Sequence, residues 1–226
     1  RAPRELQRLS EAAEAVRTRV EAQLRGQPMP TVAALSPGAP AAQALPSELG
    51  EASEFDLGLL VQQLAEPARK QALTRGLDFR VVFPDGFPTQ LTGHPMPLFR
   101  ALDGLVKNGL RSTDQGQITL KVSRAGEGPD GLRLRFEVSD SGPGIAFNDQ
   151  QALAETLATA AERPAGELSD PLQQAACLAH ALGGELSFES QPGQGSRFGF
   201  TCAFAVPGLR PATAFQPRRA AVRLAG

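Results

Sequence analysis

The stretch Val138-Ser139-Asp140-Ser141-Gly142-Pro143-Gly144-Ile145 decides which fold we expect for this chain. It closes a run from Leu132 to Val138 in which apolar and charged residues alternate, the pattern of a strand with one buried face. A carboxylate at the strand end, Asp140, can accept a hydrogen bond from an exocyclic amine, and Gly142 and Gly144 let the backbone approach a flat ring closely. A strand followed by a Gly-Pro turn would explain the same residues without any ligand.

Two other motifs lie on either side of this stretch. Upstream, Gly93-His94-Pro95 precedes a helical run that contains Leu105-Val106-Lys107-Asn108-Gly109-Leu110-Arg111. Downstream, a glycine-rich segment runs from Gly183-Gly184 to Phe198-Gly199-Phe200. In this order the three motifs resemble the catalytic and ATP-binding domain of sensor histidine kinases, a HATPase domain of the GHKL or Bergerat-fold class. The resemblance covers Phe55 to Phe204 without large gaps.

The resemblance implies a role for each of five residues. Asp140 would accept the adenine amino proton, while Gly142 and Gly144 would shape the slot for the ring. Asn108 would offer an amide oxygen to Mg²⁺, which prefers hard oxygen ligands, and Arg111 would contact phosphate one helical turn later. ATP and Mg²⁺ are therefore the implied cofactors. The alternative is structural: a turn aspartate at 140, and a polar helix surface at 108 and 111.

Two positions depart from the family pattern. Gly104 stands where the family has an asparagine, and where hydrolytic relatives such as gyrase and MutL place a glutamate that activates water. The family's second glycine box, whose backbone N–H groups bind phosphates at a helix N-terminus, aligns with Glu167-Leu168-Ser169-Asp170-Pro171-Leu172. Ser169 or Asp170 followed by proline still starts a helix, but a carboxylate there satisfies the positive helix end and repels a triphosphate. We therefore expect degenerate phosphate binding.

The chain is expected to contain four parts. Residues 1–26 are expected to form an amphipathic helix with a narrow apolar stripe. The helix either lies on the domain or pairs with a second copy, and the narrow stripe favours pairing. In the resembled family this position is the end of the dimerising hairpin, whose histidine-bearing helix is absent here. Residues 27–54 are a flexible linker rich in Pro, Ala, Gly and Ser. Residues 55–206 are the ATP-binding domain, and residues 207–226 are a Pro- and Arg-rich linker, after which hybrid kinases commonly carry a receiver domain.

For residues 55–206 we expect an α+β fold, a two-layer sandwich with one mixed sheet and helices on one face, and nucleotide between helices and loops. The predicted helices are Phe55–Gly76, Met96–Ser112, Asn148–Glu162 and Pro171–Leu182. The predicted strands are Leu77–Phe83, Thr89–Thr92, Ile118–Val122, Leu132–Val138, Leu186–Ser190 and Phe198–Phe204. Pro67 should bend the first helix and Gly76 should cap it.

Composition narrows the partners further. The net charge of −1 suggests neither nucleic acid nor an anionic membrane as a partner. Cys177 and Cys202 lack metal-ligand spacing and suit a reducing compartment, so we expect a cytoplasmic domain whose full-length protein can be membrane-anchored. His94 and His180 lack the context of a phosphoacceptor, and both are interpreted as structural.

Two functions remain open from the sequence. In the first, the domain binds Mg-ATP and transfers the γ-phosphoryl group to a histidine on the missing dimerisation helix, within a homodimer that passes phosphate to a response-regulator receiver domain. In the second, the fold is a non-catalytic, pseudokinase-type scaffold or regulator of a phosphorelay. A gyrase- or MutL-type ATPase is disfavoured by Gly104.

Overall fold

The computed structural model describes residues 49–84, 89–128 and 131–207. The predicted dimerisation helix and nearly all of the two predicted linkers lie outside these residues. The helices of the described part are α3 (Leu57–Thr74), α4 (Pro95–Ser112), α5 (Phe147–Ala161), the 3₁₀ turn η1 (Ala165–Glu167) and α6 (Pro171–Ala181). Its strands are β1 (Ser53–Asp56), β2 (Asp78–Val82), β3 (Gln90–Gly93), β4 (Gln117–Gly128), β5 (Gly131–Asp140), β6 (Ser187–Gln191) and β7 (Gly195–Phe204).

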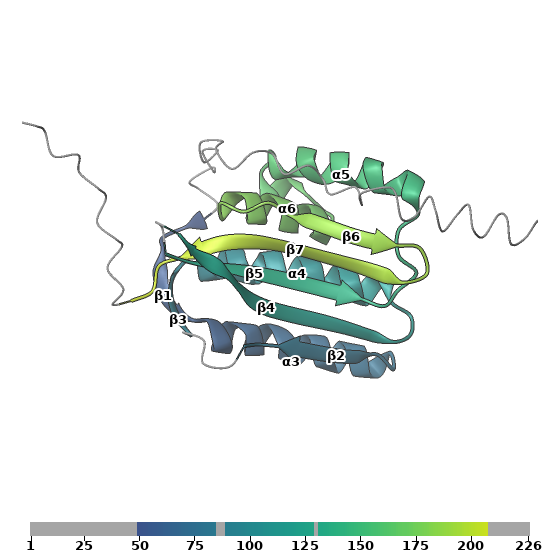
Figure 1. Ribbon diagram of the computed structural model, residues 1–226, viewed down its shortest axis with the longest axis horizontal. Coiled ribbons are helices and arrows are strands. Elements are labelled where there is room, and N and C mark those ends of the chain that lie inside the picture. The colour runs from purple at the N-terminus through teal and green to yellow at the C-terminus, as the bar shows by residue number, and fades with distance from the viewer. Residues whose placement is uncertain (1–48, 85–88, 129–130, 208–226) are drawn as a thin grey trace, which may run out of the picture. The chain divides into compact units, whose positions relative to one another are not determined.

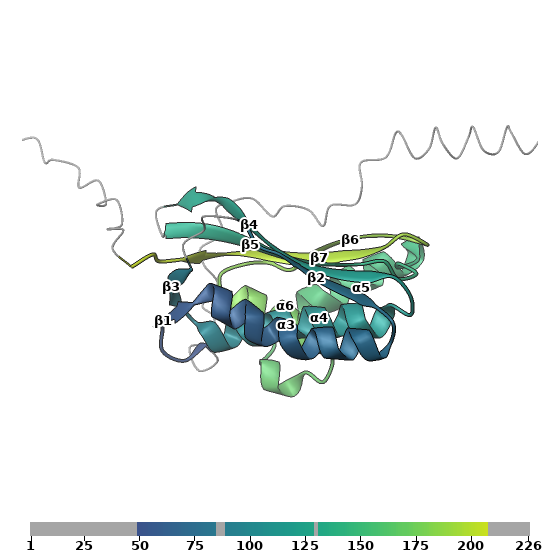
Figure 2. The ribbon, with the colours of Figure 1, turned by 90° about the horizontal axis from the view of Figure 1, so that it is seen from below.

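Five of these strands form the central sheet, in the order β2-β4-β5-β7-β6 (Figure 1). β2 pairs with β4 in parallel, and the other neighbours pair antiparallel, so the sheet is mixed as expected. The helices lie on one face of this sheet (Figure 2), where α3 packs against α4, α4 against α6, and α6 against α5. The predicted two-layer α+β sandwich is therefore confirmed.

A second, two-stranded sheet was not predicted. Ser53 to Asp56 form β1, which pairs antiparallel with β3, so Ser53 and Glu54 belong to a strand and the prediction that assigned them to a linker was wrong. The first helix correspondingly begins at Leu57 instead of Phe55. Asp56 caps it, because its Oδ1 accepts a hydrogen bond from the Leu59 N–H at 2.8 Å.

Helix α3 ends as its sequence predicts. Gly76 adopts a positive φ of 70°, and its N–H donates to the Leu73 carbonyl at 3.1 Å. The Leu77 N–H donates to the Ala72 carbonyl at 2.9 Å, which completes a Schellman motif. The chain then turns directly into β2.

The predicted glycine-rich loop between Val122 and Leu132 is shorter than expected. β4 continues to Gly128 and β5 starts at Gly131, with a register shift between Arg124 and Gly126. The bulge accommodates one extra residue on β4, so the ladder continues where the glycines favoured a loop.

The core lies between the sheet and the helices. Phe136 on β5 and Phe200 on β7 are fully buried cross-strand partners, with ring centroids 5.5 Å apart. Apolar positions on α3 and α4 pack against them as a stripe, as their spacing of three and four residues predicts. Both cysteines are buried, and burial raises the pKa of Cys202 to about 12, so that thiol behaves as a small core group.

Candidate nucleotide site

Asp140 ends the central strand β5 on the helix-covered side of the sheet. It is 9% exposed, and a Cβ built on Gly109 of α4 would lie 3.9 Å from the Asp140 Cβ. Its Oδ1 accepts hydrogen bonds from the backbone N–H of Gly142 at 2.9 Å and of Ser196 at 3.3 Å. Within the described residues, Oδ2 accepts no hydrogen bond, so one carboxylate oxygen is held in place while the other is free to accept one from a ligand.

Burial is the main influence on the pKa of Asp140. Desolvation raises the pKa of Asp140 above 3.8, and the hydrogen bonds from Gly142 and Ser196 offset only part of that rise. The native state therefore binds the Asp140 proton more tightly than the unfolded chain does. A buried carboxyl with a raised pKa, beside loops and helices, is typical of a binding site.

Replacing Asp140 with asparagine should change how stability depends on pH. The stability that the protonated carboxyl contributes is present below 3.8 and is lost as pH rises through the raised pKa. Asparagine does not titrate, so the free energy of unfolding of Asp140→Asn should improve relative to wild type between about pH 3 and pH 7. Urea unfolding of both proteins across this range measures the difference. A difference that stays constant with pH would contradict the raised pKa.

The two glycines after Asp140 are needed for close approach. A Cβ on Gly142 would come within 3.0 Å of both the Ser112 carbonyl oxygen and Asp140 Oδ1. Gly144 has a φ of +68°, and a Cβ there would overlap the carbonyl of Gln191 in β6. The loop is thus packed between the end of α4 and the β6–β7 hairpin, which fixes the position of Asp140.

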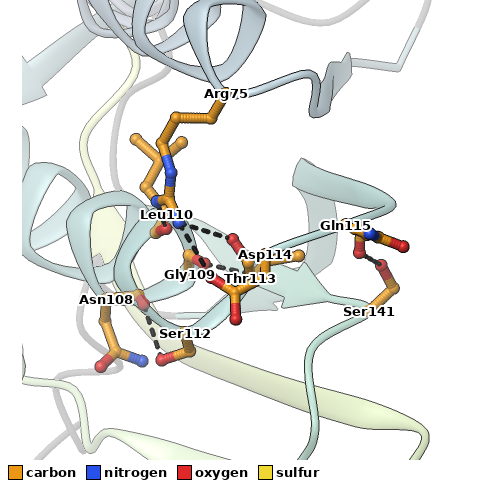
Figure 3. Close-up of polar contacts among 9 residues, drawn as sticks. All are labelled: Arg75, Asn108, Gly109, Leu110, Ser112, Thr113, Asp114, Gln115 and Ser141. Carbon is orange, nitrogen blue, oxygen red and sulfur yellow. Dashed lines mark hydrogen bonds and ion pairs between the residues drawn. The ribbon is translucent and has the colours of Figure 1, made fainter.

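The end of α4 and the loop after Asp140 are each anchored to another segment by a side chain (Figure 3). The guanidinium of Arg75, which follows α3, donates to the carbonyls of Leu110 and of Thr113, the latter at 3.0 Å. Ser141 accepts a hydrogen bond from the Gln117 N–H at 2.9 Å and so ties the Asp140 loop to the start of β4. Arg75 therefore anchors the end of α4, while Ser141 anchors the loop that follows Asp140.

Asn108 and Arg111 lie together on α4, as their spacing predicts. Asn108 is 6% exposed, and its Oδ1 accepts a hydrogen bond from Arg111 Nη2 at 3.3 Å. Arg111 Nη1 forms an ion pair with Asp170 Oδ1 at 3.1 Å. The guanidinium therefore joins α4 to the residue that begins α6.

Asp170 caps α6, as the sequence predicts. Its Oδ2 accepts from the backbone N–H of Leu172 at 3.1 Å and of Gln173 at 3.2 Å, and Pro171 opens the helix. The aligned Glu167–Leu172 segment contains the end of η1 and this cap. His94 takes the corresponding position before α4 but makes no capping bond, and its buried Nδ1 has no hydrogen-bond partner among the described residues.

α6 packs tightly against α4 at Gly104. A Cβ on Gly104 would lie within 3.0 Å of the Pro171 carbonyl oxygen and 3.2 Å from the Ala175 Cβ. Neither asparagine nor glutamate fits at this position while α6 keeps its place. In the sequence, glycine at position 104 appears to replace a ligand. In this structure the same glycine is required for α4 to pack against α6.

The side chains expected to bind Mg²⁺ and phosphate are engaged with other groups of the domain. The Asn108 oxygen that would bind Mg²⁺ accepts from the cationic Arg111, and the donors that would face phosphate already bind Asp170. Within the described ranges, no group of three or more His, Cys, Asp or Glu side chains could hold a metal ion. No described helix is both long enough and apolar enough to cross a membrane.

Sequence reasoning missed two contributors to the site. Ser196 acts through its backbone N–H, a role that residue type cannot reveal. The Arg111–Asp170 ion pair joins residues 59 positions apart, although both residues were singled out separately. The alignment of Asp170 to a phosphate-binding segment and of Arg111 to a phosphate contact was the available signal.

The chain is similar to one known protein family and to curated sensor proteins. The family described as "Histidine kinase-, DNA gyrase B-, and HSP90-like ATPase" matches residues 93–206. The chain is 32% identical over 114 residues to the sensor histidine kinase GacS of Pseudomonas protegens, covering 49% of this chain and 12% of that protein. It is 29% identical over 159 residues to the sensory/regulatory protein RpfC of Xanthomonas campestris pv. campestris, covering 68% of this chain and 22% of RpfC.

Solved structures give the same result. Full-length ShkA in complex with AMPPNP matches with a TM-score of 0.55 and 25% identity, covering 75% of this chain and 33% of that one. The catalytic domain of the histidine kinase ThkA matches with a TM-score of 0.54 at 17% identity, over 69% of this chain and 97% of that one, which supports the fold.

The chain belongs to the histidine kinase-, DNA gyrase B- and HSP90-like ATPase family. Within that family its homologues are sensor histidine kinases, and its fold is that of their catalytic, ATP-binding domain.

Proposed function

We propose that this chain is the nucleotide-binding domain of a sensor histidine kinase that has kept adenine recognition and has largely lost phosphoryl transfer. One observation carries the proposal: Asp140 is buried, oriented through Oδ1 by two backbone N–H groups, and has its Oδ2 free of hydrogen bonds within the described residues. An adenine amino group is a donor that suits this oxygen. Gly142 and Gly144 supply the close backbone approach that a flat ring needs.

We also propose the wider assembly that the family resemblance implies. A histidine on a dimerisation helix would receive the phosphoryl group, and a receiver domain would take it from there, in a homodimer of the full-length protein. Because this chain covers only 12% to 22% of the curated relatives named above, these partners are part of the proposal.

A second candidate is a non-catalytic regulatory module of a phosphorelay. The ion pair between Arg111 and Asp170 favours it, since Arg111 is the residue expected to neutralise phosphate. The packing of Gly104 against Pro171 speaks against a gyrase-type hydrolase, because no glutamate fits there to activate water.

Titration of adenosine and guanosine against wild type and Asp140→Asn tests the proposal. Adenosine should bind and guanosine, which has no 6-amino group, should bind more weakly. Asp140→Asn removes a buried charged acceptor, which costs about 1.5–3 kcal/mol, or roughly a ten- to hundredfold loss of adenosine affinity. Calorimetry measures both affinities, and circular dichroism checks the fold.

Asp149→Asn is the matched control, because Asp149 is an exposed acid in the first turn of α5 and the change in charge is the same. It should leave adenosine affinity unchanged. Equal affinity of wild type and folded Asp140→Asn for adenosine would refute the assignment, and so would equal binding of adenosine and guanosine.

A further inference from the structure

Asp170 uses the donors that a phosphate chain would need. Its Oδ2 accepts from two backbone N–H groups at the α6 N-terminus, at 3.1 and 3.2 Å. Its Oδ1 accepts from the Arg111 guanidinium at 3.1 Å, and the remaining Arg111 contact goes to Asn108 at 3.3 Å. The helix N-terminus and the cation therefore face an anion that is already part of the chain.

This arrangement opposes phosphate in two ways. An internal carboxylate sits at the donors at all times, so an external phosphate has to displace a group that cannot diffuse away. If Arg111, whose side chain is 60% exposed, swings toward a ligand, Asp170 stays at the helix end and repels the incoming negative charge.

The adenine side of the site is independent of this ion pair. Asp140 accepts hydrogen bonds from Gly142 and Ser196, whereas Asp170 accepts them from Arg111, Leu172 and Gln173, so within the described residues the two carboxylates share no hydrogen-bond donor. A change at position 170 should therefore act on the phosphate end of a ligand alone.

We infer that Asp170 determines the ligand class of this site, making it select uncharged adenine nucleosides over ATP. The carboxylate takes the place of the phosphates, and Arg111 and the α6 N-terminus neutralise it. This inference rests on the proposed adenine recognition by Asp140 and adds the specificity that the proposed function leaves open.

Affinities of adenosine and ATP for wild type and Asp170→Asn, measured by calorimetry at low salt, test the inference. Wild type should bind adenosine at least as tightly as ATP. Asparagine caps helices as well as aspartate does, so the start of α6 should persist while the negative charge is removed. ATP affinity of Asp170→Asn should rise about tenfold, and adenosine affinity should stay the same. The gain for ATP should shrink as salt is added.

Two further variants complete the experiment. Asp149→Asn removes the same charge from the first turn of α5 and should change neither affinity. Asp170→Ser keeps a capping hydroxyl and should repeat the gain for ATP if Asp170→Asn folds poorly.

The outcomes separate the two proposals. Adenosine binding with an unchanged ATP-to-adenosine ratio in both Asp170 variants would overturn the role of Asp170 and leave adenine recognition standing. Tighter binding of ATP than of adenosine by wild type would also overturn it. Failure of wild type to bind adenosine would overturn the proposed function and, with it, this inference.

Discussion

A histidine hairpin from an active sensor histidine kinase should remain almost unlabelled by radioactive ATP when this chain replaces the kinase's own ATP-binding domain. Phosphoryl transfer depends on positioning and on neutralising the charge of the transferred group. Here Arg111 pairs with Asp170, and the Asn108 oxygen accepts from Arg111. Losing one such stabilising donor commonly costs a hundredfold or more, so we expect labelling to fall by at least about a hundredfold.

The comparison requires the same hairpin with its native ATP-binding domain, to show that the histidine accepts phosphate. Acid-labile label on the hairpin, counted after gel separation, reports the transfer. Joining the two domains in one chain removes weak docking as a reason for low signal. Strong labelling by the unmodified chain would show that another segment binds the phosphates and that residues 167–172 do not correspond to the family's second glycine box.

Removing the Phe136 ring should destabilise the domain severely. Phe136 is fully buried on the central strand. Its ring centroid lies 5.5 Å from that of Phe200 and 6.1 Å from that of Phe204, the latter in an edge-on contact. Truncating such a ring to alanine leaves a cavity and costs about 3–5 kcal/mol. Because domains of this size are typically stable by only about 5–15 kcal/mol, Phe136→Ala should lose a large share of its folding free energy.

Chemical denaturation of Phe136→Ala and Phe147→Ala measures this effect. Phe147 is 64% exposed at the start of α5, so its truncation should change the free energy of unfolding by less than about 0.5 kcal/mol. Similar losses in the two variants would mean that the β5–β7 layer is not the core of the domain.

Local patterns predicted most of the fold. The helix from Pro95 to Ser112 and the strand that ends on Asp140 lie where apolar spacing of 3.6 and 2 residues indicates them. Gly76 and Asp170 stand at helix ends, where the sequence predicts caps. Gly76 ends α3 because glycine readily adopts a positive φ, and Asp170 begins α6 because its side chain accepts hydrogen bonds from nearby backbone N–H groups. Residue type predicts both of these local roles well.

The remaining features depend on distant partners. β1 exists because Ser53 to Asp56 find Gln90 to Gly93 across the fold, and its four residues carry no strand periodicity of their own. The Arg111–Asp170 contact depends on how closely α6 approaches α4, which Gly104 permits. A single sequence shows each of these residues, but the distance between them follows only from the packing.

The tight packing of α4 against α6 at Gly104 also restricts which residues position 104 can accept. An asparagine at 104 would collide with the Pro171 carbonyl for as long as α6 begins where it does. A side chain at position 104 therefore requires a change that moves the start of α6. Gly104→Asn should be harmful while α6 begins at Pro171 and should be tolerated once α6 begins elsewhere, so we expect the two regions to be epistatic.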